Sequence, residues 1–239
     1  MKKLLFACLG CGLIAVSCKK SDPAPNPVPA TPSKFFTFTP GVTWYYQTDS
    51  ASVNLGKDTL TSSNSDSLIN SKLYHIFNGT GTSGASQSFY NITGRDYYQY
   101  TSLSAQLPPL DLHYLNDSLP VLSNWSQPVS VSQSGATLTG DIKNIIAQKG
   151  ISLTVNGTPY DSVIMVRTTI ENANIDYSGQ NITPSITQDI QNFYAPRHGL
   201  IKRLLKLNIS IAPIPIFLPN GQEIINTNRT TSLMNSTVQ

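Results

Sequence analysis

The sequence predicts a mainly β fold: a single domain built as a curved antiparallel sheet or a full or half barrel, with a sandwich of two sheets as the alternative. Residues 35–239 consist of short alternating or aromatic segments, separated by glycine, proline or polar turn residues. Helical periodicity is rare. No internal repeat is visible, which argues against a propeller or a solenoid.

The first half of this domain contains aromatic strand signals. Phe36 and Phe38 alternate with threonine, and Pro40-Gly41 turns the chain before a strand expected at 43–48. Polar and glycine-rich turns separate the segments that follow. Three further strands are expected at Lys72–Phe77, Ser86–Ile92 and Asp96–Thr101.

The second half alternates more regularly. The segment 151–155 ends at Asn156-Gly157, a dipeptide typical of hairpin turns. The run Val163–Val166 is continuously apolar, which predicts burial on both faces of its strand. The strands expected in this half are Ser126–Ser132, Ile151–Val155, Tyr160–Glu171, Leu200–Ile211 and Glu223–Leu233.

Three segments have other patterns. Residues 141–148 place isoleucines at helical spacing, but we interpret them as a strand that continues from Thr137. Residues 184–192 are expected to hold one short helix. The apolar segment 209–219 contains three prolines, which block central pairing and predict an edge, a loop or a flap.

The N-terminus has the pattern of a secretory signal. Two lysines precede a run of apolar residues, and small residues lead to Cys18. This pattern resembles a bacterial lipobox, so we expect residues 1–17 to be a lipoprotein signal peptide and Cys18 to be acylated, with palmitate among its lipids. An ordinary signal peptide cut near Ser17 is the alternative. Residues 18–34 then form a proline-rich linker, and residues 35–239 form the β-rich domain.

This N-terminus predicts a location in the cell envelope. We expect an outer-membrane lipoprotein whose partner is the membrane, reached through its N-terminal lipid anchor. Lys19 and Lys20 follow the cysteine, which favours the periplasmic side over the cell surface. Removal of Lys2 and Lys3 lowers the formal charge from +3 to +1, and no basic stripe indicates a nucleic-acid partner.

Catalytic motifs are absent from the sequence. His75, His113 and His198 lack zinc-site spacing, and no nucleophile elbow occurs. We therefore expect no catalytic residue, no cofactor and no metal centre, and we lean against an enzyme. A hydrolase would require two facing carboxylates or a Ser–His pair within hydrogen-bond reach. Asn172, Asn174 and Asp176 have the alternation of a calcium loop, although a polar hairpin loop explains them as well.

A short polar triplet recurs in the chain. Aspartate followed by Ser or Thr and then a small or aliphatic residue resembles the O-glycosylation sequon of exported Bacteroidota proteins. Chance in a Ser/Thr-rich chain is the alternative. In the fifth triplet Ser162 precedes the apolar run, so we expect it to be too buried for modification. The candidate sites are Ser50, Thr59, Ser67 and Ser118.

Aromatic residues cluster in two strands and offer candidate ligand contacts. Trp44, Tyr97, Tyr98 and Tyr100 could face a ligand, stack on sugar rings or line an apolar groove. A core role is the preferred alternative for Trp44. In a concave sheet, Val163–Val166 would line or back the cavity.

Three segments together resemble a known group of proteins. Residues 157–166 read as Gly-x-x-Tyr-Asp followed by an apolar strand, residues 194–202 read as Tyr-Ala-Pro-x-x-Gly-Leu-Ile-Lys, and Trp-Tyr-Tyr occurs at 44–46. They resemble uncharacterised β-rich Bacteroidota-type envelope lipoproteins. That resemblance implies a LolA/LolB-like half-barrel and apolar-ligand binding, and it supplies no catalytic residues.

The function predicted from the sequence is therefore that of a lipid-anchored cell-envelope protein that binds a ligand or partner without catalysis. A glycan-binding surface lipoprotein is the first alternative, and a hydrolase is the second. The expected ligand is apolar or a glycan.

Overall fold

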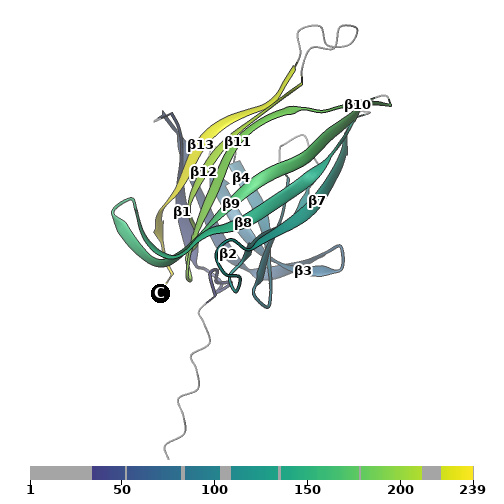
Figure 1. Cartoon of the computed structure of the whole chain (residues 1–239). Coiled ribbons are helices and arrows are strands. Elements are labelled where there is room, and N and C mark those ends of the chain that lie inside the picture. The colour runs from purple at the N-terminus through teal and green to yellow at the C-terminus, as the bar shows by residue number, and fades with distance from the viewer. Residues whose placement is uncertain are drawn as a thin grey trace, which may run out of the picture. The chain divides into compact units, whose positions relative to one another are not determined.

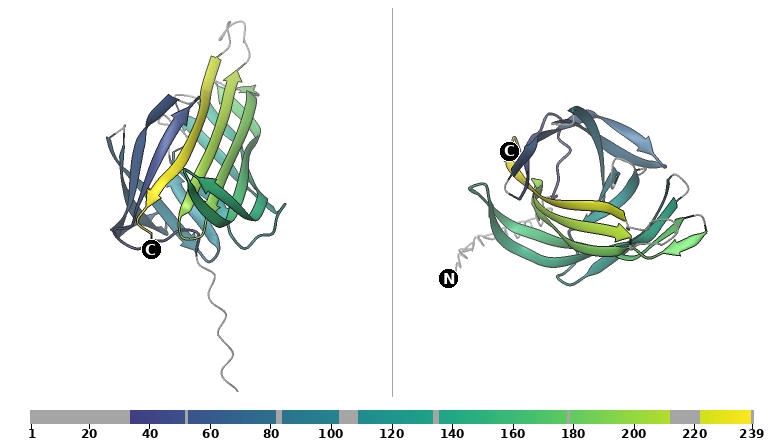
Figure 2. Two further views of the ribbon diagram at one scale, coloured as in Figure 1. Left: turned by 90° about the vertical axis from the view of Figure 1, so that its left-hand side faces the viewer. Right: turned by 90° about the horizontal axis from the view of Figure 1, so that it is seen from above.

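The strands of this protein form one antiparallel sheet that curves into a nearly closed barrel (Figures 1 and 2). The computed structural model describes residues 34–51, 53–81, 84–102, 109–133, 136–177, 179–211 and 222–238. A single continuous sheet confirms the expected curved sheet or barrel and excludes the sandwich for these residues. No helix in the described ranges is long and apolar enough to cross a membrane.

The sheet consists of two meanders, in which consecutive strands are neighbours. The first meander contains β1 (Thr43–Ser50), β2 (Val53–Ile69), β3 (Lys72–Gly81), β4 (Gly84–Thr93), β5 (Asp96–Thr101) and β6 (Leu110–Asn116). The second contains β7 (Asn124–Gln133), β8 (Ala136–Val155), β9 (Thr158–Tyr177), β11 (Ser185–Ala195), β12 (Gly199–Ile211) and β13 (Gln222–Ser236), while β10 (Gln180–Ile182) pairs only with β9.

The first and last strands join the two meanders. β1 and β13 pair antiparallel, from Trp44 opposite Ser236 to Asp49 opposite Thr230. The two edges of the sheet are therefore β6 and β7, which lie next to each other along the chain. Seen from above, the two meanders curve around and face each other (Figure 2).

Side chains bridge these two edges. Gln127 on β7 donates from Nε2 to the Asp111 carbonyl of β6 and accepts from the His113 amide at 3.1 Å. Trp125 donates from Nε1 to the His113 carbonyl at 2.9 Å. The amide of Gln127 thus occupies two backbone groups that an edge strand would otherwise present unpaired. In the described residues the barrel is closed here by side chains rather than by a backbone ladder.

The segment before β1 enters one end of the barrel and forms part of the core. Phe36 forms a bridge with His198, stacks on Phe77 with ring centroids 5.0 Å apart, and packs on Trp44 at 4.9 Å. Gly199 permits this close approach: its φ is +68°, and a Cβ at that position would lie 2.5 Å from Cδ2 of Phe36. The core therefore lies at this end of the barrel.

The expected strands of both halves are observed, and the expected helix is not. Residues 141–148 belong to β8, which confirms the strand interpretation. The short helix expected at 184–192 is wrong: these residues belong to β11, whose backbone pairs with β9 on one side and β12 on the other. The two neighbouring strands provide hydrogen-bond partners for the backbone amides and carbonyls of this segment, and this pairing outweighs its local preference for a helix.

The apolar run 163–166 is fully enclosed, as its pattern predicts. All four side chains are buried, although successive residues of a strand point to opposite faces. The β8–β9 hairpin bends at three register shifts near its tip, and Asn156 at the turn donates to the Leu233 carbonyl of β13 at 2.9 Å. The tip of the hairpin thus reaches β13 at this end of the barrel.

Candidate functional site

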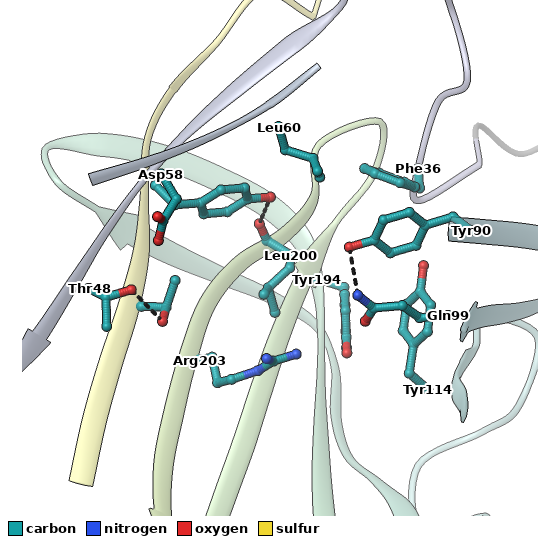
Figure 3. A pocket seen from close by; sticks show the side chains of 12 residues that line it. Phe36, Thr48, Asp58, Leu60, Tyr90, Gln99, Tyr114, Tyr194, Leu200 and Arg203 are labelled. Atoms are coloured by element: carbon teal, nitrogen blue, oxygen red, sulfur yellow. Dashed lines mark hydrogen bonds between the residues drawn. The ribbon is translucent and has the colours of Figure 1, made fainter. Parts of the chain in front are cut away.

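The interior of the barrel contains a cavity of about 210 Å³ next to the aromatic core. Phe36 separates the two, because it belongs to the core and also lines the cavity. The most distinctive lining groups are four tyrosines and one arginine (Figure 3). They come from five strands: Tyr46 from β1, Tyr90 from β4, Tyr114 from β6, Tyr194 from β11 and Arg203 from β12.

The four tyrosines form a poorly hydrated wall. Tyr114 contacts Tyr90 edge-on at 6.3 Å between ring centroids and Tyr194 at 5.5 Å. Burial raises the pKa of Tyr90 to about 12 and also raises the pKa values of Tyr46, Tyr114 and Tyr194 well above the ordinary value for tyrosine. Desolvation is the main cause in each case, since it disfavours the phenolate. All four hydroxyls therefore keep their protons at neutral pH.

Three of these hydroxyls have protein partners, among them that of Tyr194, which accepts a hydrogen bond from the Arg203 side chain. Tyr46 donates to the Leu200 carbonyl at 3.1 Å, so its hydrogen is used. Tyr90 accepts from Nε2 of Gln99 at 3.1 Å, which leaves its own hydrogen free to donate. In the described part of the chain, the Tyr114 hydroxyl has no hydrogen-bond partner. The cavity is therefore rich in donors.

A chain of polar side chains orients Arg203. Its Nε donates to Oδ1 of Asn192 at 2.7 Å, and Asn192 is buried. Asn192 in turn donates to Thr168 Oγ1 at 3.4 Å, and Thr168 donates to Oδ1 of Asn144 at 2.7 Å. Asn144 completes the chain with a bond of 3.2 Å to the His113 carbonyl at the seam. The guanidinium of Arg203 extends along the cavity wall toward Tyr194, as Figure 3 shows, and donates a hydrogen bond to the Tyr194 hydroxyl, which leaves its remaining terminal N–H groups to the cavity.

A second hollow of about 220 Å³ adjoins the first. The two share Tyr46, Asp58, Leu60 and Tyr90, and the second continues along the glycine-rich ends of β3 and β4. Asp58 is exposed and forms an ion pair with none of the described cations. The two hollows together give the interior cavity a route outward.

The aromatic candidates from the sequence lie elsewhere. Trp44 and Tyr97 are 0% and 1% exposed and belong to the core cluster, where neither offers a surface to a ligand. Tyr98 and Tyr100 alternate with Tyr97 and therefore face outward from the barrel. Tyr98 stacks on His113 at 4.8 Å, and the Lys72 ammonium lies 2.9 Å from its ring centroid.

The cavity residues themselves carried no recognisable motif in the sequence. Tyr46 was visible only as the neighbour of Trp44 on one strand face, and Tyr90, Tyr114 and Tyr194 are single tyrosines in separate strands. The available signal was Arg203, which with Lys202 forms a pair of adjacent charges between the apolar residues of β12.

The candidate glycosylation positions differ in exposure. Ser118 is exposed, whereas Ser50, Thr59 and Ser67 are partly buried. The expectation that Ser162 is too buried is wrong: it is exposed, with a φ of 56° that turns it away from the buried run after it. Modification of the candidates stays a prediction.

The calcium candidates are spread along a strand. Asn172, Asn174 and Asp176 lie in β9, and alternate residues of a strand stand roughly 6.6 Å apart, which does not gather their oxygens around one ion. Asn172 donates to Asp141 at 2.8 Å, and Asp176 accepts from the Gly179 amide at 3.0 Å. The described residues contain no group of three or more His, Cys, Asp or Glu that could hold a metal.

A Ser–His–Asp arrangement occurs outside the cavity. Oγ of Ser62 lies 2.9 Å from Nε2 of His75, and Nδ1 of His75 lies 2.7 Å from Oδ1 of Asp66. These are the contacts that a hydrolase requires. Ser62 is only 1% exposed, however, and Phe38 stacks on the His75 ring at 5.0 Å. The serine therefore has no access to a substrate.

Cys18, the signal peptide, most of the linker and the prolines of the expected flap lie outside the described residues. The predictions made for these segments are therefore not tested by the structure.

Comparison with known proteins shows a likeness of fold to solved structures but does not assign the chain to a family. No protein family and no curated protein matches the chain. A crystal structure from Parabacteroides distasonis ATCC 8503, provisionally described as a lipoprotein, matches with a TM-score of 0.54 at 12% identity, over 87% of this chain and 100% of that one. A second, from Bacteroides fragilis NCTC 9343, is provisionally described as an exported protein with a YmcC-like fold and matches with a TM-score of 0.42 at 7% identity, over 86% and 99%. The predicted likeness to Bacteroidota envelope lipoproteins is thus confirmed for the fold, while a LolA/LolB-like half-barrel stays a prediction.

Proposed function

We propose that this protein is a lipid-anchored cell-envelope protein that binds one small ligand inside its barrel and does not transform it. The observation that carries the proposal is the cavity of about 210 Å³ among partly buried tyrosines. Ligand sites are concave and mostly apolar, with a few polar groups that fix orientation. Drug-sized ligands occupy roughly 300–1,000 Å³, so the enclosed part of this ligand is smaller.

The envelope location is supported from two directions. The N-terminal pattern ends at Cys18, which in the lipobox reading carries the acyl chains. The likeness of the fold to a protein described as a lipoprotein agrees with that reading. The outer membrane, and its periplasmic side, are the location we propose.

The chemistry of the cavity favours binding over catalysis. Among the described residues that line it, Asp58 is the single carboxylate and there is no histidine, serine or cysteine. A glycosidase needs two facing carboxylates, and a serine hydrolase needs an accessible serine beside its base. The lining instead supplies aromatic surface and hydrogen-bond donors, which suit recognition.

Blocking the cavity tests this function. Leu60 of β2 lines both hollows, so Leu60→Trp should fill the space, whereas Leu68→Trp places the same side chain on the same strand at a position that is 71% exposed. We expect native mass spectrometry of protein purified from membranes to show a stoichiometric small molecule that Leu60→Trp loses and Leu68→Trp keeps. Extraction and mass analysis then identify the molecule. Equal occupancy of both variants, or an empty parent protein, would contradict the proposal.

A glycan ligand on the outer face is the second candidate. Tyr98, His113 and Trp125 form a row of rings, with successive centroids 4.8 and 5.1 Å apart, and aromatic rows of this kind stack on sugars. The Lys72 ammonium and the His113 ring already contact Tyr98, which leaves less of it for a sugar. Binding on a glycan array that Tyr98→Ala abolishes would favour this candidate over the cavity.

A further inference from the structure

The donor groups of the cavity indicate which kind of ligand it takes. We infer that the ligand carries an oxyanion, a carboxylate or a phosphate, which the Arg203 guanidinium binds inside the barrel with help from the Tyr90 and Tyr114 hydroxyls. This inference rests on the function proposed above and adds the chemical class of the ligand.

The charge of Arg203 has no counterpart in the described structure. None of the ion pairs among the described residues includes it. Asp58, the carboxylate of the same lining, is exposed at the outer hollow and does not reach the guanidinium. An arginine keeps its charge under all ordinary conditions. A permanent cation in a poorly hydrated space is costly unless an anion joins it.

The polar chain behind Arg203 fixes its direction. Asn192 holds Nε at 2.7 Å, and the chain through Thr168 and Asn144 holds Asn192. A guanidinium that is tied at Nε presents its two terminal nitrogens side by side, which is the geometry of a two-bonded contact with a carboxylate or phosphate. The chain spans β12, β11, β9 and β8, so the barrel wall itself orients the group.

The neighbouring hydroxyls add further donors. The raised pKa values of Tyr90 and Tyr114 keep both phenols protonated, and both retain a hydrogen that no described residue accepts. Three donor groups from three strands thus face one small space, while Asp58, the described carboxylate of its lining, lies exposed toward the outer hollow. This balance suits an anionic oxygen and is unfavourable for an ammonium group.

The test compares ligands with the same tail and different heads. Octanoate, octyl phosphate, octanol and octylamine are titrated by calorimetry into delipidated protein, with inorganic phosphate as a probe without a tail. We expect octanoate or octyl phosphate to bind and octanol and octylamine to bind at least about tenfold more weakly. Preference between the first two identifies the head group, and binding of inorganic phosphate alone identifies a free anion as the source.

Variants assign the binding to Arg203. Arg203→Gln should weaken oxyanion binding at least about tenfold, and Arg203→Lys should restore part of it, because the charge returns without the paired geometry. Arg229→Gln is the matched control, since Arg229 is exposed on neighbouring β13 and the charge change is the same. Thermal unfolding of each variant checks that it is folded.

The outcomes separate this inference from the function beneath it. If a ligand co-purifies and Leu60→Trp removes it, but no oxyanion binds or Arg203→Gln leaves binding unchanged, the inference is overturned and the binding function stands. If neither a co-purified molecule nor any probe occupies the barrel, both fail.

Discussion

Ser62 and Arg203 both carry groups used in protein active sites, and their surroundings give them different roles. Ser62 has the partners of a catalytic serine, but its backbone amide donates to Val42 at 2.9 Å and its carbonyl accepts from Gly41 at 2.9 Å. These bonds bind β2 to the segment before β1, so the serine is part of the packing. Arg203 has fewer partners, yet it faces open space. The two residues therefore differ in whether a small molecule can reach them: Ser62 is buried, whereas Arg203 lines the cavity.

A serine-reactive probe tests the closed arrangement at the residue scale. We expect a fluorophosphonate not to label the folded protein, because Ser62 is 1% exposed. Ser62→Ala should lower the free energy of unfolding by about 1–3 kcal/mol, since it leaves Nε2 of His75 without its partner. Ser63→Ala, the neighbouring substitution, should cost less. Stoichiometric labelling that Ser62→Ala abolishes would instead reveal a hydrolase.

The residues of the site were harder to predict than the fold. Strand alternation places Trp44 and Tyr46 on one face, but it does not state that Trp44 ends in a core and Tyr46 beside a cavity. That difference depends on Phe36, which enters the barrel from outside the sheet ladder. A contact between two segments that lie far apart in the chain produces no pattern in the sequence of either segment, so it could not be predicted.

At the scale of single elements, the seam between β6 and β7 is the unusual feature. An unpaired edge normally exposes a row of amides and carbonyls that can pair with another chain. Here Gln127 and Trp125 cover three such groups on β6. A strand edge is thereby closed by two side chains, and the interior stays shielded without a further ladder.

Removing the amide of Gln127 should open this seam. Gln127→Leu leaves the His113 amide and the Asp111 carbonyl without partners, so we expect the free energy of unfolding to fall by about 1–3 kcal/mol and the His113 amide to exchange faster with deuterium. Urea unfolding and hydrogen exchange measure the two effects. Gln87→Leu, at an exposed position on β4, is the control. Equal stability of the two variants would show that the seam contributes nothing.

Most strands with alternating or aromatic residues were predictable, and those without were missed. β9 and β12 match their apolar patterns, whereas β2 is rich in serine, threonine and aspartate and carries no alternating signal. It forms because β1 and β3 on either side satisfy its backbone. β6 was also missed, although Leu110, Leu112 and Tyr114 alternate with polar residues; its backbone pairs with β5 on one side and is covered by the seam on the other.

At the scale of the whole molecule, burial of tyrosines links stability to alkaline pH. The unfolded chain releases phenolic protons near pH 10.0, while the folded protein retains those of the cavity tyrosines, whose pKa values are raised. The folded state then binds more protons than the unfolded state. Stability is therefore complete below pH 10.0 and falls as the pH rises above it.

The size of this effect can be measured. Each tyrosine that stays protonated only in the folded state removes up to about 1.4 kcal/mol per pH unit, so the four together should produce a steep loss of stability above pH 10. We expect tyrosinate absorbance to rise together with the loss of β circular dichroism as the pH increases. Ionisation of all the tyrosines near pH 10 with the barrel intact would contradict the burial of their hydroxyls.

The insertion of β13 between β1 and β12 has a consequence for how the chain matures. On one side, β1 pairs with β2, which follows it directly in the chain, so that Thr43 lies opposite Thr61. On its other side it pairs with β13, so that Trp44 lies opposite Ser236, far away in the sequence. Such distant pairing gives a high contact order, and folds of this kind form slowly. In the export that we propose, a chain that crosses the membrane with its N-terminus first therefore cannot close into a barrel until β13 has emerged.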